Sequence, residues 1–175
     1  MKVLIISVCK EDLHMLEFVK PIGDILSKND VDYFVQRYDE LKNADIDNAD
    51  KIIIAGTSLH DNDYLRYDFE FLRSTRKPVL GICAGMQLIG RAYGLSLKQN
   101  TEIGFYDEDF TEEFLGLSGK QNVYHLHNYY IDFNNSEFIV FADNQAVKHN
   151  RKEIYGVLFH PEVRQKELIK KFIGL

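Results

Sequence analysis

The chain has 175 residues, of which 45% are hydrophobic and 27% are charged, and its formal net charge is −6. This length fits one domain, or one domain with a small appendage, and the composition is that of a globular protein with a sizeable core, which excludes a disordered or fibrous chain. The negative charge opposes attraction to a phosphate backbone or an anionic membrane, so we expect no nucleic-acid partner and no membrane partner.

The first part of the chain alternates between buried strands and helical patterns. The nearly continuous apolar run at residues 3–8 predicts a strand covered on both faces, as in a parallel sheet. Apolar residues spaced three or four apart predict a helix over residues 13–26, which Pro21 should distort or restart. Residues 31–35 are expected to form the second strand.

The middle of the chain continues this alternation. The polar stretch at residues 39–50 favours only a short turn of helix, and residues 51–55 predict a third buried strand. A helix is expected over residues 64–74, another buried strand over 78–82 and a further helix over 84–93. The resulting order predicts an α/β fold with an open, mostly parallel, flavodoxin-like sheet and helices on both faces.

The second half of the chain has a different pattern. Short strand-like runs between residues 95 and 141 are separated by an acidic stretch at 107–113 (DEDFTEE) and an Asn-rich stretch at 134–137 (NNSE). Both stretches read as turns. The second half therefore predicts an antiparallel excursion from the parallel sheet.

A buried strand at residues 154–159 and a short helix at 167–173 are expected to complete a single domain over residues 1–175. The two cysteines, Cys9 and Cys83, are too few for a disulfide framework, and charged residues follow the first apolar run too early for a signal peptide. No apolar run approaches the roughly 20 residues that cross a bilayer. These features favour a cytoplasmic protein.

The strongest chemical signal is Gly-Ile-Cys-Ala-Gly at residues 81–85, which follows an apolar strand and opens a helical pattern. A nucleophile at such a strand-to-helix turn needs a strained backbone, and glycines on both sides remove Cβ atoms that would clash. The helix N-terminus favours the thiolate, which is the nucleophilic form. Cys83 is therefore a candidate nucleophile, and the alternative is a core cysteine in a short chance pattern.

A second segment, Phe-His-Pro-Glu at residues 159–162, follows another buried strand. Because open α/β sheets place their sites at the carboxyl ends of the strands, His160 should lie at the same edge as Cys83. A cysteine nucleophile needs an imidazole as acid and base, and Glu162 can orient that imidazole. Taken alone, the segment also fits a surface histidine at the end of a strand.

Together the two segments resemble those of the class I (triad) glutamine amidotransferases, whose nucleophile elbow and His-x-Glu pair look like residues 81–87 (GICAGMQ) and 159–162 (FHPE). The order of elements also resembles the family's fold. Residues 127–130 (HNYY) are similar to the family's His-Ser-Tyr segment beside the glutamine pocket. The end of the chain looks most like the amidotransferase subunits of GMP synthetase and of anthranilate or aminodeoxychorismate synthase.

The resemblance implies a catalytic triad and a substrate site. The triad would consist of the nucleophile Cys83, the acid and base His160, and the orienting group Glu162. Gln87 would bind glutamine, together with main-chain groups around Asn128 and Tyr129.

The resemblance also implies an oxyanion hole made by the backbone N–H of Ala84 and one N–H from the loop after the third strand, at Gly56. Most family members have a Gly-Gly-Pro-like loop there, whereas this chain has Ala-Gly-Thr-Ser-Leu-His at residues 55–60. One lost oxyanion donor typically costs about 100-fold or more in rate. We therefore expect the isolated chain to be a slow enzyme.

The other histidines carry weaker signals. His125 and His127 alternate along a strand-like run and face one side, but no third ligand at suitable spacing accompanies them, so we expect no metal and no cofactor. His14, His60 and His149 lie in polar surroundings and are expected to be solvated.

The leading functional hypothesis is an enzyme that hydrolyses the side-chain amide of glutamine and supplies ammonia to a separate synthase subunit, because a chain of 175 residues leaves no room for a synthase domain. The second hypothesis is a stand-alone hydrolase of γ-glutamyl compounds that uses the same triad. The third is a non-catalytic regulatory subunit in which the changed loop has removed activity.

Overall fold

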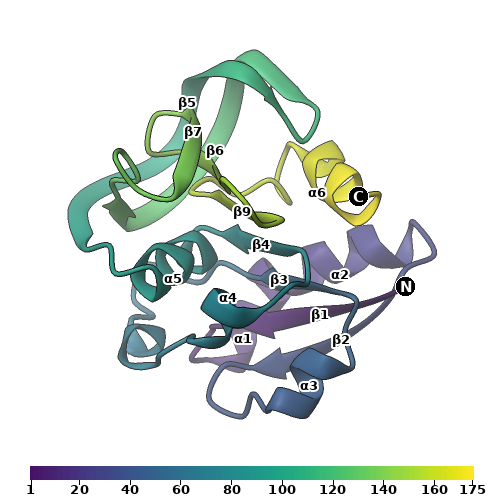
Figure 1. Ribbon diagram of the computed structural model, residues 1–175. Coiled ribbons are helices and arrows are strands. Elements are labelled where there is room, and N and C mark those ends of the chain that lie inside the picture. The colour runs from purple at the N-terminus through teal and green to yellow at the C-terminus, as the bar shows by residue number, and fades with distance from the viewer.

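The computed structural model describes residues 1–175, and its elements follow the predicted order (Figure 1). The parallel strands are β1 (Lys2–Ser7), β2 (Asp32–Arg37), β3 (Lys51–Ile54), β4 (Val79–Ile82) and β9 (Ile154–Val157). The helices are α1 (Asp12–Phe18), α2 (Lys20–Ser27), α3 (Asn43–Asp47), α4 (Phe71–Ser74), α5 (Ala84–Ala92) and α6 (Lys166–Ile173), with a 3-10 turn η1 (Asp63–Arg66). None of these helices has the length and apolar character needed to cross a membrane.

A sheet of seven strands, in the order β2-β1-β3-β4-β9-β8-β7, forms the centre of the molecule. Strands β1 to β4 and β9 pair in parallel. Strands β8 (Ala146–His149) and β7 (Phe138–Ala142) extend the sheet through antiparallel pairs. The predicted open, mostly parallel α/β sheet is confirmed.

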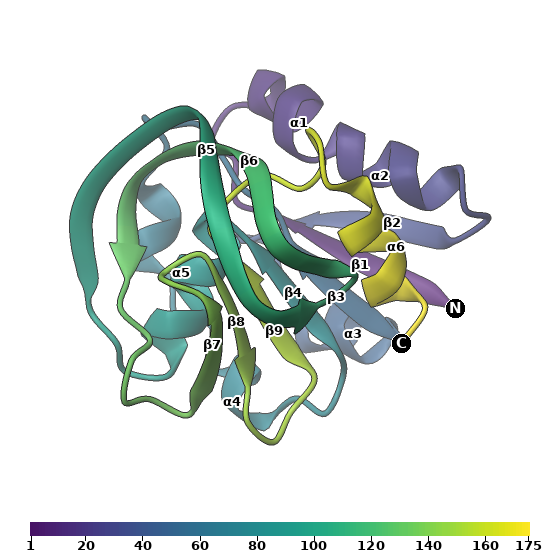
Figure 2. The ribbon, with the colours of Figure 1, turned by 90° about the horizontal axis from the view of Figure 1, so that it is seen from above.

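The apolar run of β1 is continuous because both faces of the sheet are covered. Val3 and Ile5 belong to the core that contains the apolar residues of α2 and α6, whereas Leu4 and Ile6 belong to the core that contains those of α5. All four side chains are fully buried. Figure 2 shows α1, α2 and α6 on one side of the sheet and α3, α4 and α5 on the other.

The helix predicted over residues 13–26 is two helices, because the chain restarts at the proline. α1 ends at Phe18 and α2 begins at Lys20, so Pro21 lies in the first turn of α2. Its missing N–H needs no acceptor in that position. The predicted restart at Pro21 is confirmed.

The prediction of one continuous helix over residues 64–74 is wrong. The chain forms η1 and α4 there, separated by extended backbone at Tyr67 (φ −99°, ψ 145°). Tyr64 and Phe69 are both buried in the same core. In one helix these two residues would point about 140° apart, at about 100° per residue. The break allows both side chains to enter the core.

Two long strands, β5 (Leu97–Phe114) and β6 (Leu117–Ile131), pair antiparallel in a separate sheet. Figure 2 shows this β-ribbon arching over the central sheet. The predicted antiparallel excursion is confirmed, and the Asn-rich stretch at residues 134–137 is a turn as expected.

The prediction of a turn at the acidic residues 107–113 is wrong, because this stretch lies inside β5. Phe110 and Phe114 are buried and anchor the strand, while most of the acidic side chains between and before them are exposed. The chain reverses instead at Leu115 and Gly116, whose φ angles are 47° and 84°. Burial of the two phenylalanines therefore outweighs the local turn signal.

Candidate active site

The site lies where three neighbouring parallel strands end. Strands β3, β4 and β9 are adjacent in the sheet, and Gly56, Cys83 and His160 lie just beyond their carboxyl ends. The β5–β6 ribbon lies over this edge and contributes backbone oxygens to the site. The structure thus brings the two segments of the sequence motif together at one sheet edge.

Cys83 occupies a strained turn between β4 and α5. Its φ and ψ angles are 50° and −104°, a region that residues with a Cβ atom rarely adopt. A Cβ atom at Gly81 would lie 2.6 Å from the carbonyl of Gly85, and one at Gly85 would collide with Ile54 O. The expected need for glycines on both sides of Cys83 is therefore confirmed.

His160 is oriented by Glu162 in the buried part of the site. His160 Nδ1 lies 2.7 Å from Glu162 Oε1, and the two residues are 1% and 3% exposed. Burial alone would lower the pKa of His160, but the charges of Glu162 and Cys83 and the hydrogen bond to Glu162 outweigh burial and raise this pKa well above its ordinary value. The site therefore favours the imidazolium form, with a proton held on Nδ1.

Cys83 lies close enough to His160 to affect the charge of the imidazole. The charge of Cys83 contributes to the raised pKa of His160. Cys83 Sγ also lies 3.5 Å from Leu126 O on β6. His160 Nε2 is buried and has no hydrogen-bond partner, so this nitrogen is free to exchange a proton with a neighbouring group.

Gly56 lies directly beside these residues. A Cβ atom at this position would be 2.6 Å from His160 Cε1 and 3.3 Å from Cys83 Cβ. The Gly56 N–H makes no hydrogen bond within the protein. The N–H of Ala84, at the first position of α5, has no acceptor in its own helix. Both predicted donors are thus available to an anionic oxygen next to Cys83.

One buried carboxylate holds the loop that follows Gly56. Asp61 Oδ2 accepts hydrogen bonds from Thr57 Oγ1 at 2.7 Å and the Lys10 N–H at 3.0 Å, and it lies 2.8 Å from His14 Nδ1. Burial alone would raise the pKa of Asp61, but these hydrogen bonds lower it. His14, expected to be solvated, is half-buried and contacts this carboxylate. Asp61 was not among the predicted site residues, because its partners Lys10 and His14 are distant in the sequence.

Gln87 lies on α5 and is held by two tyrosines. Tyr64 Oη donates a hydrogen bond of 2.6 Å to Gln87 Oε1, and Gln87 Nε2 donates one of 2.8 Å to Tyr129 O. The structure thus joins the predicted residues Gln87 and Tyr129 and adds Tyr64, which the sequence pattern assigned to a regular helix. The Gln87 amide keeps one N–H and one oxygen lone pair for a ligand.

The hollow beside Cys83 is small. Its volume is about 20 Å³, which is room for about one water molecule. Asn128 lines it, and Asn128 Nδ2 donates to Leu59 O at 3.0 Å while Asn128 Oδ1 accepts from Thr101 Oγ1 at 3.1 Å. The Asn128 side chain therefore ties β6 to the loop after β3.

The second cysteine and the remaining histidines have other environments. Cys9 is fully buried, and burial raises the pKa of its thiol, so this group is a poor nucleophile. His149, expected to be solvated, is buried, and its Nδ1 accepts hydrogen bonds from the N–H groups of Arg151 and Lys152. His60 is exposed, as expected.

The expectation that no third ligand accompanies His125 and His127 is wrong. Both lie on β6, and the antiparallel register places Glu102 of β5 opposite His127. Ligand atoms of these three residues lie within 4.8 Å of one another. Spacing along one strand could not reveal this group, because the carboxylate comes from the neighbouring strand.

The fold and the arrangement around Cys83 define a class of α/β proteins with a cysteine on a strained strand-to-helix turn and a histidine–glutamate pair just beyond the end of the adjacent strand. Residues 15–173 match the family described as glutamine amidotransferase class-I. Because this match spans most of the chain, the protein belongs to the class I glutamine amidotransferase family. The resemblance seen in the sequence motifs is confirmed.

The chain is similar in sequence to GMP synthases. It is 32% identical over 137 residues to the glutamine-hydrolysing GMP synthase of Spiroplasma kunkelii, and this match covers 70% of this chain and 27% of that protein. It is 35% identical over 106 residues to one subunit of the glutamine-hydrolysing GMP synthase of Methanothermobacter thermautotrophicus, and this match covers 54% of this chain and 56% of that relative. The chain thus spans between about a quarter and about half of these relatives.

Solved structures share the fold. A Thermoplasma acidophilum protein, provisionally assigned as one subunit of a GMP synthase, superposes with a TM-score of 0.86 over 99% of this chain and 92% of that chain, at 22% identity. A glutamine amidotransferase from Thermotoga maritima superposes with a TM-score of 0.73 over 99% and 81%, at 21% identity. These similarities support the same α/β architecture.

Proposed function

We propose that this protein hydrolyses the side-chain amide of glutamine and supplies the ammonia to a separate synthetase subunit. The observation that carries the proposal is the position of Cys83, on a strained turn next to His160, whose Nδ1 is held by Glu162 and whose Nε2 is free. Membership of the class I glutamine amidotransferases supports glutamine as the substrate.

In the first half of the reaction, the Cys83 thiolate attacks the side-chain carbonyl carbon of glutamine and forms a C–S bond. The N–H groups of Gly56 and Ala84 stabilise the charge that develops on the carbonyl oxygen. His160 transfers its Nε2 proton to the amide nitrogen as the C–N bond breaks, and ammonia leaves. A γ-glutamyl thioester remains on Cys83.

In the second half, neutral His160 takes a proton from a water molecule that attacks the thioester carbon. The C–S bond breaks, glutamate leaves, and Cys83 and His160 return to thiolate and imidazolium. Glu162 stabilises the imidazolium form and keeps the ring oriented in both halves.

Glutamine binding requires movement of the loop after β3, because the hollow beside Cys83 has only about 20 Å³. The hydrogen bond from Asn128 to Leu59 joins two residues that line this hollow, and we infer that it breaks when the substrate binds. Gln87 and Tyr129 also line the hollow. We infer that the synthetase favours the open form when it docks against this loop.

The similarity to proteins named as subunits of glutamine-hydrolysing GMP synthases supports a partner that uses the ammonia to make GMP. The two cysteines are free thiols, and the mechanism needs Cys83 to stay reduced. This requirement supports the cytoplasm as the place of action.

The test is steady-state hydrolysis of glutamine by the purified chain, alone and with the GMP synthetase subunit of the same organism. We expect slow hydrolysis by the chain alone and a higher kcat/KM with the partner. Full activity that no partner changes, with a preference for γ-glutamyl peptides, would favour a stand-alone hydrolase. No turnover in either condition, with Cys83 inert to a glutamine-analogue alkylator, would favour a non-catalytic subunit.

Replacement of Gly56 by alanine should disturb the triad directly. The added methyl group would lie 2.6 Å from His160 Cε1, so the ring must move. A misplacement of about 1 Å costs about 100-fold in rate, and we expect a fall in kcat of at least about that size. Gly174→Ala, near the end of the chain, is the matched control. Wild-type kcat in Gly56→Ala would show that the ring does not need this space.

Asp61→Asn should loosen the loop that carries Gly56. An amide cannot accept hydrogen bonds from Thr57, Lys10 and His14 as a carboxylate does, so the Gly56 N–H would be less well placed. We expect kcat to fall between about 10-fold and 100-fold, with KM little changed, because the lost interaction is made in the transition state.

The control for this variant is Asp63→Asn. Asp63 is half-buried and its side chain forms only ion pairs with surface partners, 3.5 Å from Lys10 Nζ and 3.9 Å from Arg66 Nη1. Its replacement should leave both constants unchanged. A rise in KM with constant kcat in Asp61→Asn would instead assign the loop to substrate binding.

A further inference from the structure

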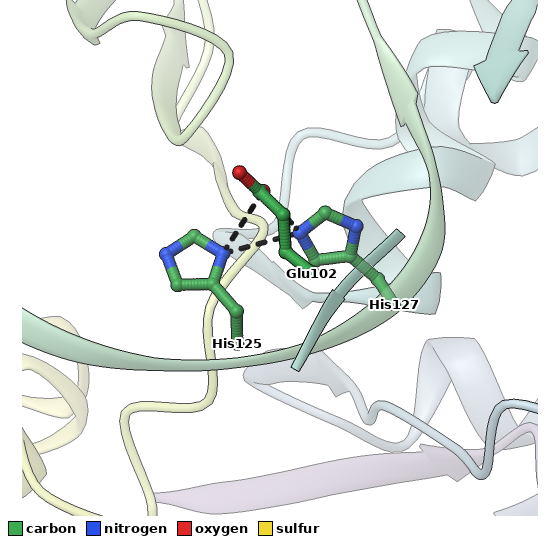
Figure 3. Close-up of side chains that lie close together, drawn as sticks. All are labelled: Glu102, His125 and His127. Carbon is green, nitrogen blue, oxygen red and sulfur yellow. Dashed lines mark hydrogen bonds and ion pairs between the residues drawn. The ribbon is translucent and has the colours of Figure 1, made fainter. Parts of the chain in front are cut away.

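A second cluster of buried polar side chains lies in the β5–β6 ribbon (Figure 3). His125 and His127 lie two residues apart on β6, so they face the same side, and Glu102 on β5 is paired with His127. The histidines are 0% and 2% exposed. Figure 3 shows the two imidazole rings and the carboxylate pointing toward one another.

Three ligand atoms meet at the centre of this cluster. Glu102 Oε2 is 2.9 Å from His127 Nε2 and 3.4 Å from His125 Nδ1, and the two nitrogens are 3.1 Å apart. In a tetrahedral zinc site with ligand distances of about 2.0–2.2 Å, neighbouring ligand atoms are about 3.3–3.5 Å apart. A small expansion of the triangle therefore accommodates such an ion.

Hydrogen bonds within the cluster do not satisfy all three atoms. One proton between the two nitrogens satisfies that pair, while Glu102 Oε2 remains a buried atom without a hydrogen bond. A cation at the centre would receive a lone pair from each of the three atoms.

The surroundings of the cluster also suit an ion. His125 Nε2, the nitrogen that points away from the centre, lies at an ion-pair distance of 3.2 Å from Glu108 Oε1, although the two atoms do not have hydrogen-bond geometry. Histidines that bind a metal commonly direct their other N–H to a carboxylate, which fixes the ring. A polar hollow of about 420 Å³, lined by Glu102, Glu108 and Gln145 among others, lies beside the cluster. This hollow provides access for the ion and for a water molecule.

We propose that Glu102, His125 and His127 bind one divalent transition-metal ion of the zinc class, with a water molecule from the hollow as the fourth ligand. Two imidazoles and one carboxylate match the preferences of Zn²⁺, whereas Mg²⁺ and Ca²⁺ prefer oxygen ligands alone. This binding goes beyond the proposed glutamine hydrolysis and does not depend on it.

The place of the ion gives it a structural role for the active site. Residues of β6 adjacent to its ligands contact the triad: Tyr124 O accepts the His160 N–H at 2.9 Å, and Leu126 O lies 3.5 Å from Cys83 Sγ. His127 itself lines the hollow beside Cys83. An ion that joins β5 to β6 at this point holds these contacts in position.

The test is zinc binding to the purified chain, with its affinity tag removed and bound metals stripped by a chelator. We expect calorimetry to show one Zn²⁺ per chain, Co²⁺ to give the absorption of a tetrahedral site, and the Tm to rise with the free zinc concentration. The variants Glu102→Gln and His125→Gln should each weaken zinc binding by at least about 100-fold. This loss is larger than the one expected from replacing a residue that only contacts a ligand.

Matched variants separate ligand loss from other effects. Glu108→Gln should weaken binding by about 10-fold, because this residue only orients His125. His60→Gln, which removes an exposed histidine, should leave binding unchanged. Circular dichroism verifies folding, and Glu102→Gln is the safer variant because the Glu102 side chain is 21% exposed and the amide keeps its shape.

Cys83→Ala distinguishes this site from the triad, which could itself hold zinc through a thiolate. We expect zinc binding to persist in Cys83→Ala, and the Co²⁺ complex of the wild-type chain to lack a thiolate-to-metal charge-transfer band. Zinc binding that is absent from the wild-type chain, undiminished in Glu102→Gln and His125→Gln, or lost in Cys83→Ala would overturn the proposal.

Discussion

Cys83→Ala is expected to reduce glutamine turnover to background, a loss on the order of 10⁴-fold or more, because the thioester can no longer form. The fold should persist, since alanine is smaller than cysteine and the buried side chain at this position leaves only a small cavity. The measurement is kcat with glutamine, accompanied by Tm. Retention of most of the wild-type activity would contradict the assignment of Cys83 as nucleophile.

Covalent labelling tests the same assignment and uses Cys9 as an internal control. A glutamine-analogue alkylator should modify Cys83, which lines the hollow, and should spare Cys9, which is fully buried with a raised thiol pKa. Peptide mass mapping after labelling identifies the modified residue. Labelling of Cys9 in preference to Cys83 would place the reactive thiol elsewhere.

His160→Ala should be nearly as damaging as the loss of Cys83, because general acid–base catalysis is typically worth about 100-fold to 10,000-fold. Glu162→Gln should cost less, since the amide oxygen can still accept the proton on His160 Nδ1 and the buried surroundings hold the ring. Glu167→Gln, an exposed residue paired with Lys170, is the matched control. A Glu162→Gln variant slower than His160→Ala would require the two roles to be exchanged.

The pH dependence of Glu162→Gln provides a second measurement. The charge of Glu162 helps to raise the pKa of His160, so removal of that charge should lower this pKa. The alkaline limb of the kcat/KM profile, where the imidazolium proton is lost, should therefore shift to lower pH. The profile reports the coupled pair of Cys83 and His160 and not one residue alone. An unchanged alkaline limb would mean that another group controls it.

Local patterns in the sequence were sufficient to predict the parallel half of the fold and the proximity of Cys83 and His160. Continuous apolar runs predicted the strands buried on both faces, and Pro21 predicted the restart of a helix, because these signals act over a few residues. The strained turn at Cys83 could be predicted because Gly81 and Gly85 lie close to it in the sequence. The position of His160 followed from a general rule for the carboxyl ends of parallel strands.

Only the tertiary structure decided the features that depend on residues far apart in the chain. Asp61 holds its loop through partners 47 and 51 residues away, and Tyr64 reaches Gln87 because a predicted helix is broken to bury two aromatic side chains. The register of the β-ribbon brings Glu102 to His125 and His127. Register and burial are set by the packing of the whole chain, so the spacing of residues within one segment cannot specify them.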